Sequence, residues 1–330
     1  MTQAAGSKTI ETRMTDAASR LKSARAEIGK VIFGQNDVVD RVLITLMSGG
    51  HVLLIGVPGL AKTLLVETVA TVMGLSASRI QCTPDLMPAD ILGSEVLEEA
   101  EDGKRAFRFI KGPIFTQFLM ADEINRASPR TQSALLQAMQ EGHVSVSGKP
   151  HALPKPFHVL ATQNPIEQEG TYPLPEAQLD RFLMQVDVDY PTLDAERQVI
   201  LATTTNKDRG AKALFKKSDL LDIQELVRDM PVGEKVVDAI LTLVRRGRPG
   251  DDAPELVNQY VQWAPGPRAS QALMLACRAK ALLEGRSAPS TEDVITLAEP
   301  ILKHRMALNY QARADGITLQ DVINSLTDGL

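Results

Sequence analysis

The sequence contains little cysteine, few aromatic residues, no long apolar run and no excess of basic residues. Its two cysteines, Cys82 and Cys277, lie far apart and share no metal-ligand spacing, so we expect buried, reduced thiols. No run approaches the ~18 apolar residues of a membrane span, and the polar residues 1–16 do not resemble a signal peptide. We therefore expect a cytoplasmic protein.

The charge balance argues against a nucleic-acid-binding protein. The net charge is -5, so the chain as a whole does not attract a phosphate backbone, although a local basic patch remains open. The chain has 330 residues, of which 44% are hydrophobic and 23% charged, as in an ordinary globular protein. This length allows two domains, or one core with a sizeable appendage.

The stretch GVPGLAKT, residues 56–63, indicates a phosphate-binding loop. It follows the apolar run 52–55 and leads into a helical pattern, so the local order is strand, glycine-bearing turn, helix. Gly56 and Gly59 allow the backbone N–H groups to point inward, Lys62 can reach the β- and γ-phosphates, and Thr63 can place its hydroxyl on Mg²⁺. The predicted nucleotide-contacting residues are Gly56, Val57, Pro58, Gly59, Leu60, Ala61, Lys62, Thr63 and Leu64.

Ala61 departs from the usual phosphate-loop pattern, which has glycine at this position. A methyl group is the smallest side chain that could intrude, so we expect a slightly stiffer loop and retained binding. A structural turn with an incidental lysine is the alternative interpretation of the stretch.

Two carboxylates directly follow a second apolar run. Residues 118–121 are followed by Asp122 and Glu123, which is the pattern of a buried parallel strand with acid at its carboxyl end, where open α/β sheets bind ligands. In a phosphate site Asp122 would hold Mg²⁺, usually through water, and Glu123 would polarise the attacking water. Asn164, after the apolar run 157–162, offers a donor and an acceptor to a water or a γ-phosphate, although Asn-Pro is also an ordinary turn opener.

The order of the remaining elements predicts an α/β core followed by a helical domain. Predicted strands at 52–55, 79–83, 118–121, 157–162 and 182–188, separated by helices and turns, predict a parallel sheet with helices on both faces. Alternating stretches at 105–112 and 143–153 predict two hairpins. The arginines and phenylalanines of the first could contact nucleic acid, but such a stretch is more often a solvated strand.

Beyond Pro191 the sequence indicates helices alone, at 194–204, 218–229, 233–246, 268–284 and 290–308. Ser290 and Asp293 form a capping-box pattern, and Pro300 should kink the last helix. We divide the chain into a polar tail at 1–20, an α/β core at 21–191 and a helical domain at 192–330. Arg268, at the start of a helix, opposes the helix dipole, which favours an anionic partner such as a phosphate over a solvent-exposed side chain.

These motifs together resemble the MoxR family of AAA+ ATPases, over about residues 31–307. The resemblance rests on GVPGLAKT with its alanine, IQCTPDLMPADILG, FIKGPIF, FLMADEINRASPRTQSALLQAMQEG, ATQNP, PLPEAQLDRF and GPRAS. It implies a P-loop NTPase core with a C-terminal all-α lid domain. Residues 56–63 are similar to Walker A and Asp122–Glu123 to Walker B. Asn164 is similar to sensor 1.

The resemblance also implies how the chain assembles and acts. Arg268 is similar to the sensor-2 residue of the lid, and Arg181 to the arginine finger that enters a neighbouring subunit's site, where Arg126 or Arg130 could also act. The hairpins are similar to the helix-2 insert and the pre-sensor-1 hairpin, which face the central pore. Family members bind ATP and Mg²⁺ and form hexameric rings.

The family's biological role is the last implication. Its members are chaperone-like ATPases that often work with proteins bearing von Willebrand factor A domains, in metal insertion or in maturation of protein complexes. Two other functions stay open: a nucleic-acid motor, and a nucleotide-dependent binding switch with little turnover. Retention of Glu123 and Arg181 favours turnover.

Overall fold

The computed structural model describes residues 9–99, 105–166, 170–204 and 210–330. Contacts between residues divide the chain into two compact units. The first, which we call the sheet unit, comprises Ile28–Val42 and Gly49–Lys217. The second, the helical unit, comprises the described residues up to Glu27 together with Leu43–Ser48 and Ser218–Leu330.

The sheet unit is built on five parallel strands in the order β2-β5-β8-β1-β9. Their bounds are β1 Val52–Ile55, β2 Ala77–Gln81, β5 Phe118–Asp122, β8 His158–Gln163 and β9 Met184–Asp187. Each lies within one or two residues of a strand predicted from the sequence, so the predicted sheet is confirmed. Because all five run in one direction, their carboxyl ends meet along one edge of the sheet.

Helices cover both faces of this sheet, as expected. The helical elements of the unit are α3 Lys62–Met73, α4 Pro88–Leu92, the 3₁₀ turn η1 Ile124–Arg126, α5 Pro129–Glu141, α6 Glu176–Leu179 and α7 Leu193–Thr203. Leu135, Leu136 and Met139 of α5 share one buried cluster with alternate strand residues such as Leu119 and Ala121. Helix α3, which contributes no residue to that cluster, packs against β5 from the other face.

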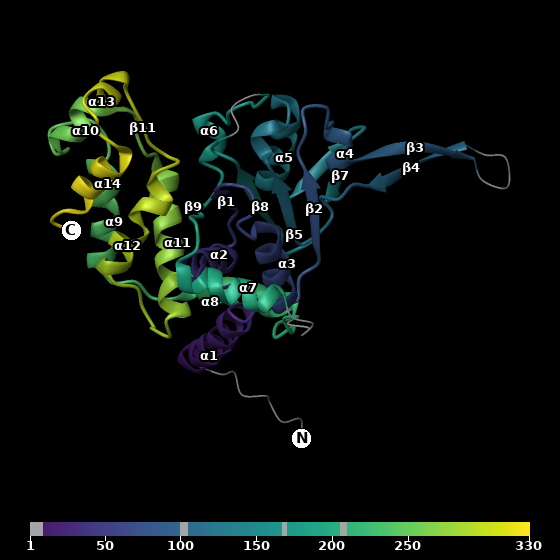
Figure 1. The fold of residues 1–330 in the computed structure, drawn as a ribbon, viewed down its shortest axis with the longest axis horizontal. Helices are drawn as coiled ribbons and strands as arrows, with labels where there is room; N and C mark the ends of the chain where they lie inside the picture. The colour runs from purple at the N-terminus through teal and green to yellow at the C-terminus, as the bar shows by residue number, and fades with distance from the viewer. Residues whose placement is uncertain (1–8, 100–104, 167–169, 205–209) are drawn as a thin grey trace. The chain divides into compact units, whose positions relative to one another are not determined.

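Both predicted hairpins are present. One consists of β3 Gly93–Glu99 and β4 Arg105–Lys111, the other of β6 His143–Val146 and β7 Lys149–Ala152. Strands β3 and β4 extend outward from the sheet (Figure 1). The hairpins contact each other: the rings of Phe109 and His151 stack with centroids 3.9 Å apart, and Lys149 Nζ lies 3.6 Å from Glu95 Oε1.

The helical unit contains more elements than the sequence predicted. Its bounds are α1 Ile10–Ile28, the second half of α2 Asn36–Met47, α8 Lys217–Asp229, α9 Glu234–Arg246, α10 Glu255–Tyr260, β10 Val261–Trp263, α11 Pro267–Leu283, α12 Thr291–Leu302, β11 Ala307–Leu308, α13 Tyr310–Ala314 and α14 Leu319–Thr327. The antiparallel pair β10 and β11 shows that the C-terminal part is not purely helical. None of the described helices combines the length and apolar character that crossing a membrane needs.

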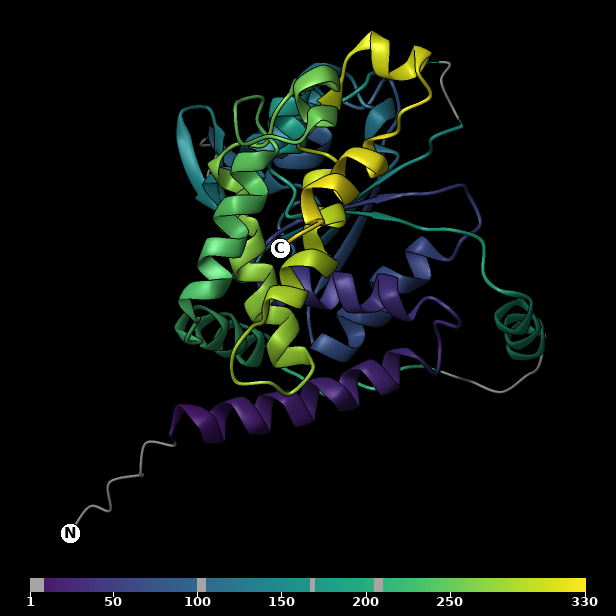
Figure 2. The same ribbon diagram turned by 90° about the vertical axis from the view of Figure 1, so that its left-hand side faces the viewer.

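Three sequence expectations are corrected here. Residues 10–20 are not a tail, because α1 runs from Ile10 as one continuous helix (Figure 2) and buries Met14, Leu21 and Ala24 at helical spacing. The division of the chain falls near residue 217, not 191, because α7 groups with the sheet. The last long helix contains Pro300 and ends at Leu302 instead of continuing to 308.

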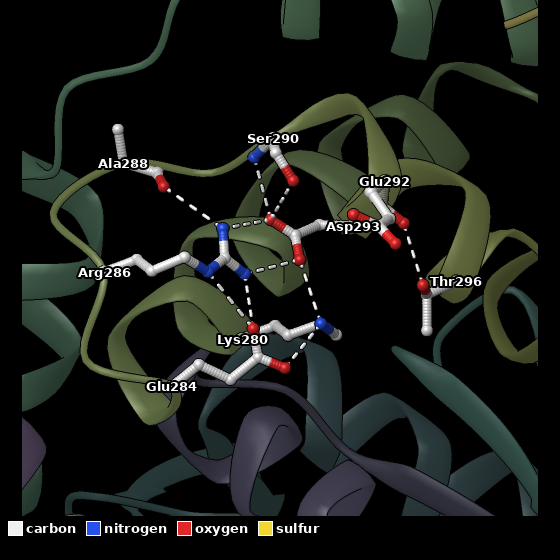
Figure 3. Close-up of polar contacts among 8 residues, drawn as sticks. All are labelled: Lys280, Glu284, Arg286, Ala288, Ser290, Glu292, Asp293 and Thr296. Carbon is white, nitrogen blue, oxygen red and sulfur yellow. Dashed lines mark hydrogen bonds and ion pairs between the residues drawn. The ribbon is translucent and has the colours of Figure 1, made fainter.

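A buried carboxylate fixes the start of α12. The predicted capping box is confirmed: Ser290 N donates to Asp293 Oδ2 at 2.8 Å. The Asp293 side chain, only 2% exposed, also binds Arg286 at 2.6 Å and Lys280 at 3.0 Å (Figure 3). Burial opposes its ionisation, but the hydrogen bonds from Arg286, the Ser290 N–H and Lys280 outweigh burial and lower its pKa.

Candidate nucleotide site

The loop between β1 and α3 has the backbone of a phosphate cradle. Gly59 and Ala61 both adopt positive φ, +85° and 55°, and Ala61 is the N-cap of α3 without any side chain capping the helix. The N–H groups of the first turn therefore keep their capacity for an anion. Gly56 also permits a close approach of another chain segment, because a Cβ at this position would lie 2.6 Å from Val188 O.

The cost of Ala61 comes from its left-handed backbone conformation. A left-handed conformation at a non-glycine residue costs roughly 1–2 kcal/mol, because Cβ crowds the following carbonyl oxygen. Ala61 is therefore held in a conformation that glycine prefers, and the expected stiffness of the loop stays a prediction.

Lys62, the first residue of α3, points its ammonium group back into the loop. Its Nζ donates hydrogen bonds to Gly56 O and, at 3.2 Å, to Val57 O. Burial lowers the pKa of Lys62, and the nearby carboxylates of Asp122 and Glu123 counteract part of that effect. The cation is thus positioned between the loop and the two acids.

One hydroxyl group positions both acids. Thr162 Oγ1 donates to Asp122 Oδ1 at 2.6 Å and accepts from Glu123 N at 2.8 Å. This contact follows from the sheet register, which pairs Ala121 of β5 with Ala161 of β8. Glu123 has a φ of 55°, a rare conformation of the kind that concentrates at functional sites.

The adjacent edge strand supplies two further contacts to the acids. Arg79 Nη2 donates to Asp122 Oδ2 at 2.5 Å, and Gln81 Nε2 donates to Glu123 Oε2 at 2.8 Å. Arg126 Nη1 also lies 3.3 Å from Glu123 Oε2. Each carboxylate therefore has a partner from β2 in addition to Thr162 or Arg126.

Asn164 completes the group from the end of β8. It is buried, and its Oδ1 accepts from Ile166 N at 3.1 Å. A cavity of about 510 Å³ is lined by Pro58, Gly59, Leu60, Ala61, Lys62, Thr63, Leu64, Arg79, Gln81, Asp122, Glu123 and Asn164. Thus ten predicted site residues from three segments of the chain lie around one cavity: residues 58–64, Asp122, Glu123 and Asn164.

This donor set fits a nucleotide phosphate with a hard divalent cation. Uncapped N–H groups and an ammonium suit phosphate oxygens, and the Thr63 hydroxyl with the Asp122 carboxylate supplies the oxygen ligands that Mg²⁺ prefers. Lys62 would hold the phosphates, and Thr63 and Asp122 the metal.

Comparison with known proteins decides the family. Residues 51–184 match the family described as "ATPase family associated with various cellular activities (AAA)", and residues 254–326 match the AAA lid domain. The chain is 45% identical to Chaperone MoxR1 of Mycobacterium tuberculosis, over 92% of this chain and 80% of that protein. It is 30% identical to Protein MoxR of Paracoccus denitrificans, over 93% and 95%. The chain belongs to the MoxR family of AAA+ ATPases.

Solved structures agree with this assignment. The crystal structure of a protein from Cytophaga hutchinsonii assigned as an ATPase matches this MoxR-family chain with a TM-score of 0.90 and 38% identity, covering 97% of each chain. The expected fold, an AAA+ core followed by a largely helical lid region, is thereby confirmed.

Of the two arginines implied by the MoxR resemblance, Arg181 is not among the residues that line the described cavity, and Arg268 belongs to the other unit. Arg181, just after α6, donates from Nη1 to Leu136 O of α5 at 2.6 Å. Arg268 is exposed in the first turn of α11, in the helical unit. Of the alternatives, Arg126 binds Glu123 of its own chain, and Arg130 is exposed in the first turn of α5.

Sequence reasoning missed Arg79, Gln81 and Thr162. Their signal is positional: once β2, β5 and β8 are aligned in parallel, Gln81 pairs with Asp122 and Thr162 follows the partner of Ala121. A strand-by-strand alignment of the MoxR core would have brought all three to the acids.

Proposed function

We propose that this chain is an Mg²⁺-dependent ATP hydrolase that works in an oligomeric ring, a hexamer, and remodels or matures partner proteins. The observation that carries the proposal is the convergence of a phosphate loop, two acids and an amide on one cavity. Membership of a family of ATPases and similarity to a protein named a chaperone support it.

The roles of the residues follow from their chemistry. Lys62 and the N–H groups of residues 59–64 bind the phosphates, and Thr63 and Asp122 hold the metal. When bound, Mg²⁺ supplies positive charge that offsets the charge on the β- and γ-phosphates. Glu123 accepts a proton from the attacking water, and Asn164 orients that water or the γ-phosphate.

Hydrolysis in this proposal requires a neighbouring subunit. No arginine of the sheet unit other than Arg79 lines the described cavity, and Arg79 is already paired with Asp122. Charge on a phosphoryl transition state needs a further cation, and an arginine finger contributes ~10³–10⁵ in rate. We assign this role to Arg181 of the adjacent subunit, and we assign Arg268 the role of reporting nucleotide state through the lid.

The partners we propose are client proteins and a protein with a von Willebrand factor A domain, in complex maturation or metal insertion. A nucleic-acid motor is less well supported. The basic residues Arg105 and Arg108 of the first hairpin pair with Glu99 and Glu98 on the same hairpin, so part of its positive charge is neutralised.

A mixing experiment tests the shared site. Lys62→Ala and Arg181→Ala are each expected to lose at least about 100-fold in ATP turnover, because one loses its phosphate contact and the other the finger it lends. Mixed together they should recover activity, since an Arg181→Ala subunit keeps its phosphate loop and receives the finger of a Lys62→Ala neighbour.

Controls separate assembly from chemistry. Lys235→Ala, an exposed lysine of α9, should leave turnover unchanged, and native mass spectrometry should report mixed oligomers. Arg130→Ala, mixed with Lys62→Ala in the same way, tests whether Arg130 is the arginine finger instead. If mixed rings form and no activity returns, Arg181 does not act across subunits and the proposed mechanism fails.

A further inference from the structure

A chain of three hydrogen bonds connects the two acids through β2. Arg79 Nη2 donates to Asp122 Oδ2 at 2.5 Å and also to Gln81 Oε1 at 2.8 Å. Gln81 Nε2 in turn donates to Glu123 Oε2 at 2.8 Å. One guanidinium nitrogen therefore touches the metal-binding acid directly and the proposed base through a single amide.

Asp122 has one oxygen committed to the interior and one facing the cavity. The Thr162 hydroxyl takes Oδ1 in a buried hydrogen bond, so Oδ2 is the oxygen that Arg79 reaches from the cavity side. The Asp122 side chain is 13% exposed and that of Arg79 is 49% exposed. A guanidinium that is half in solvent loses little when it moves fully into water, so its ion pair is exchangeable.

A second cation at the same oxygen would compete with Arg79. A hydrated Mg²⁺ held by Asp122 needs the Oδ2 side of the carboxylate and repels the guanidinium. Once Arg79 leaves, Gln81 Oε1 loses its donor, and the amide that binds Glu123 is no longer fixed from its other end.

We propose that Arg79 is a counter-ion that Mg²⁺ displaces from Asp122, and that this displacement breaks the hydrogen bond by which Arg79 fixes the Gln81 amide. The inference rests on the proposed function, because it assumes that Asp122 holds the metal. Arg79 is a positioning residue in this scheme: it fixes the carboxylate of Asp122 and the amide of Gln81 until the metal is loaded.

The test measures binding and not turnover. For each variant, the affinity for a fluorescent methylanthraniloyl-ADP is determined in EDTA and in excess Mg²⁺. The ratio of the two dissociation constants, EDTA over Mg²⁺, is the magnesium gain. Arg79→Gln should raise the magnesium gain about five- to tenfold, because the metal no longer competes with a charged hydrogen bond that is partly screened by solvent.

A double-mutant cycle tests the link to Gln81. Gln81→Leu should raise the magnesium gain about twofold in the wild-type background, since Arg79 then loses its second acceptor, and should have no effect in Arg79→Gln. Equal effects in both backgrounds would show that the two residues act independently and would overturn the link.

Controls keep this result separate from the proposed function. Arg105→Gln removes an arginine paired with Glu99 at 3.2 Å, away from the cavity, and should leave the magnesium gain unchanged. Lys62→Ala should abolish binding in both conditions; if it does not, the nucleotide site itself is wrong. If Lys62→Ala behaves as expected but Arg79→Gln leaves the gain unchanged, or weakens binding equally in EDTA and Mg²⁺, then Arg79 is not displaced by the metal.

Discussion

Two histidines at the start of neighbouring strands make the sheet unit sensitive to acid. His51 lies just before β1 and His158 begins β8, with ring centroids 6.5 Å apart. His51 Nδ1 accepts from Val159 N at 3.0 Å, and His158 Nδ1 lies 2.7 Å from Gly50 O. Burial lowers the pKa of His51 to about 3, with a further contribution from His158, and burial lowers that of His158 to about 4.

The sign and size of the effect follow from linkage. A histidine whose pKa is lowered on folding leaves the free energy of unfolding at its full value above its unfolded pKa of about 6.5. As the pH falls below that value, the unfolded chain takes up the proton first, so the free energy of unfolding decreases. At pH 5 each histidine lowers the free energy of unfolding by about 2 kcal/mol relative to pH 8, so the two together lower it by about 4 kcal/mol.

The perturbation is His51→Asn with His158→Asn, since asparagine can supply an acceptor at the first position and a donor at the second. Urea unfolding is followed by circular dichroism at pH 8, 6.5 and 5. Between pH 8 and pH 5 the free energy of unfolding should fall by about 4 kcal/mol more for the wild type than for the double variant. Each single variant should remove about half of that difference. An identical pH dependence for wild type and double variant would refute the reasoning, as would a histidine ring titration by NMR with both pKa values near 6.5.

Two further predictions concern single residues. Ala61→Gly should raise the free energy of unfolding by up to about 1 kcal/mol, because relief of the left-handed strain exceeds the added chain entropy of glycine; a lower urea midpoint would contradict this. Asp293→Asn should lower the stability of the helical unit by roughly 3 kcal/mol, since Arg286 and Lys280 lose their buried partner, and thermal unfolding measures it. The nucleotide affinity of Asp293→Asn should stay unchanged, because the cavity belongs to the sheet unit; a matching loss of binding would count against this separation.

The sequence predicted those parts of the fold that local patterns determine. Local strand patterns predicted all five parallel strands, and alternation predicted both hairpins. It missed β10 and β11, because strands of three and two residues are too short to show alternation. It also missed α1 before Leu21, because a helix with few apolar positions resembles a polar tail until its spacing is counted.

The candidate site likewise has a part that local motifs predict and a part that only the folded chain shows. Lys62, Thr63 and Asp122 were identifiable because each belongs to a short motif beside a strand. The Arg79 contact joins residues 43 positions apart in the chain, so it exists only once β2 and β5 are in register. The left-handed backbone of Ala61 was likewise invisible, since a residue name does not state its φ.

The contact between the hairpins has a mechanical consequence. The stacked rings of Phe109 and His151 and the ion pair of Glu95 with Lys149 couple the hairpin β3–β4 to the hairpin β6–β7. The second hairpin continues directly from α5, whose N-cap Ser128 stands five positions after Glu123. A force on the hairpin β3–β4 is therefore transmitted through β6–β7 and along α5 to the segment that contains Asp122 and Glu123.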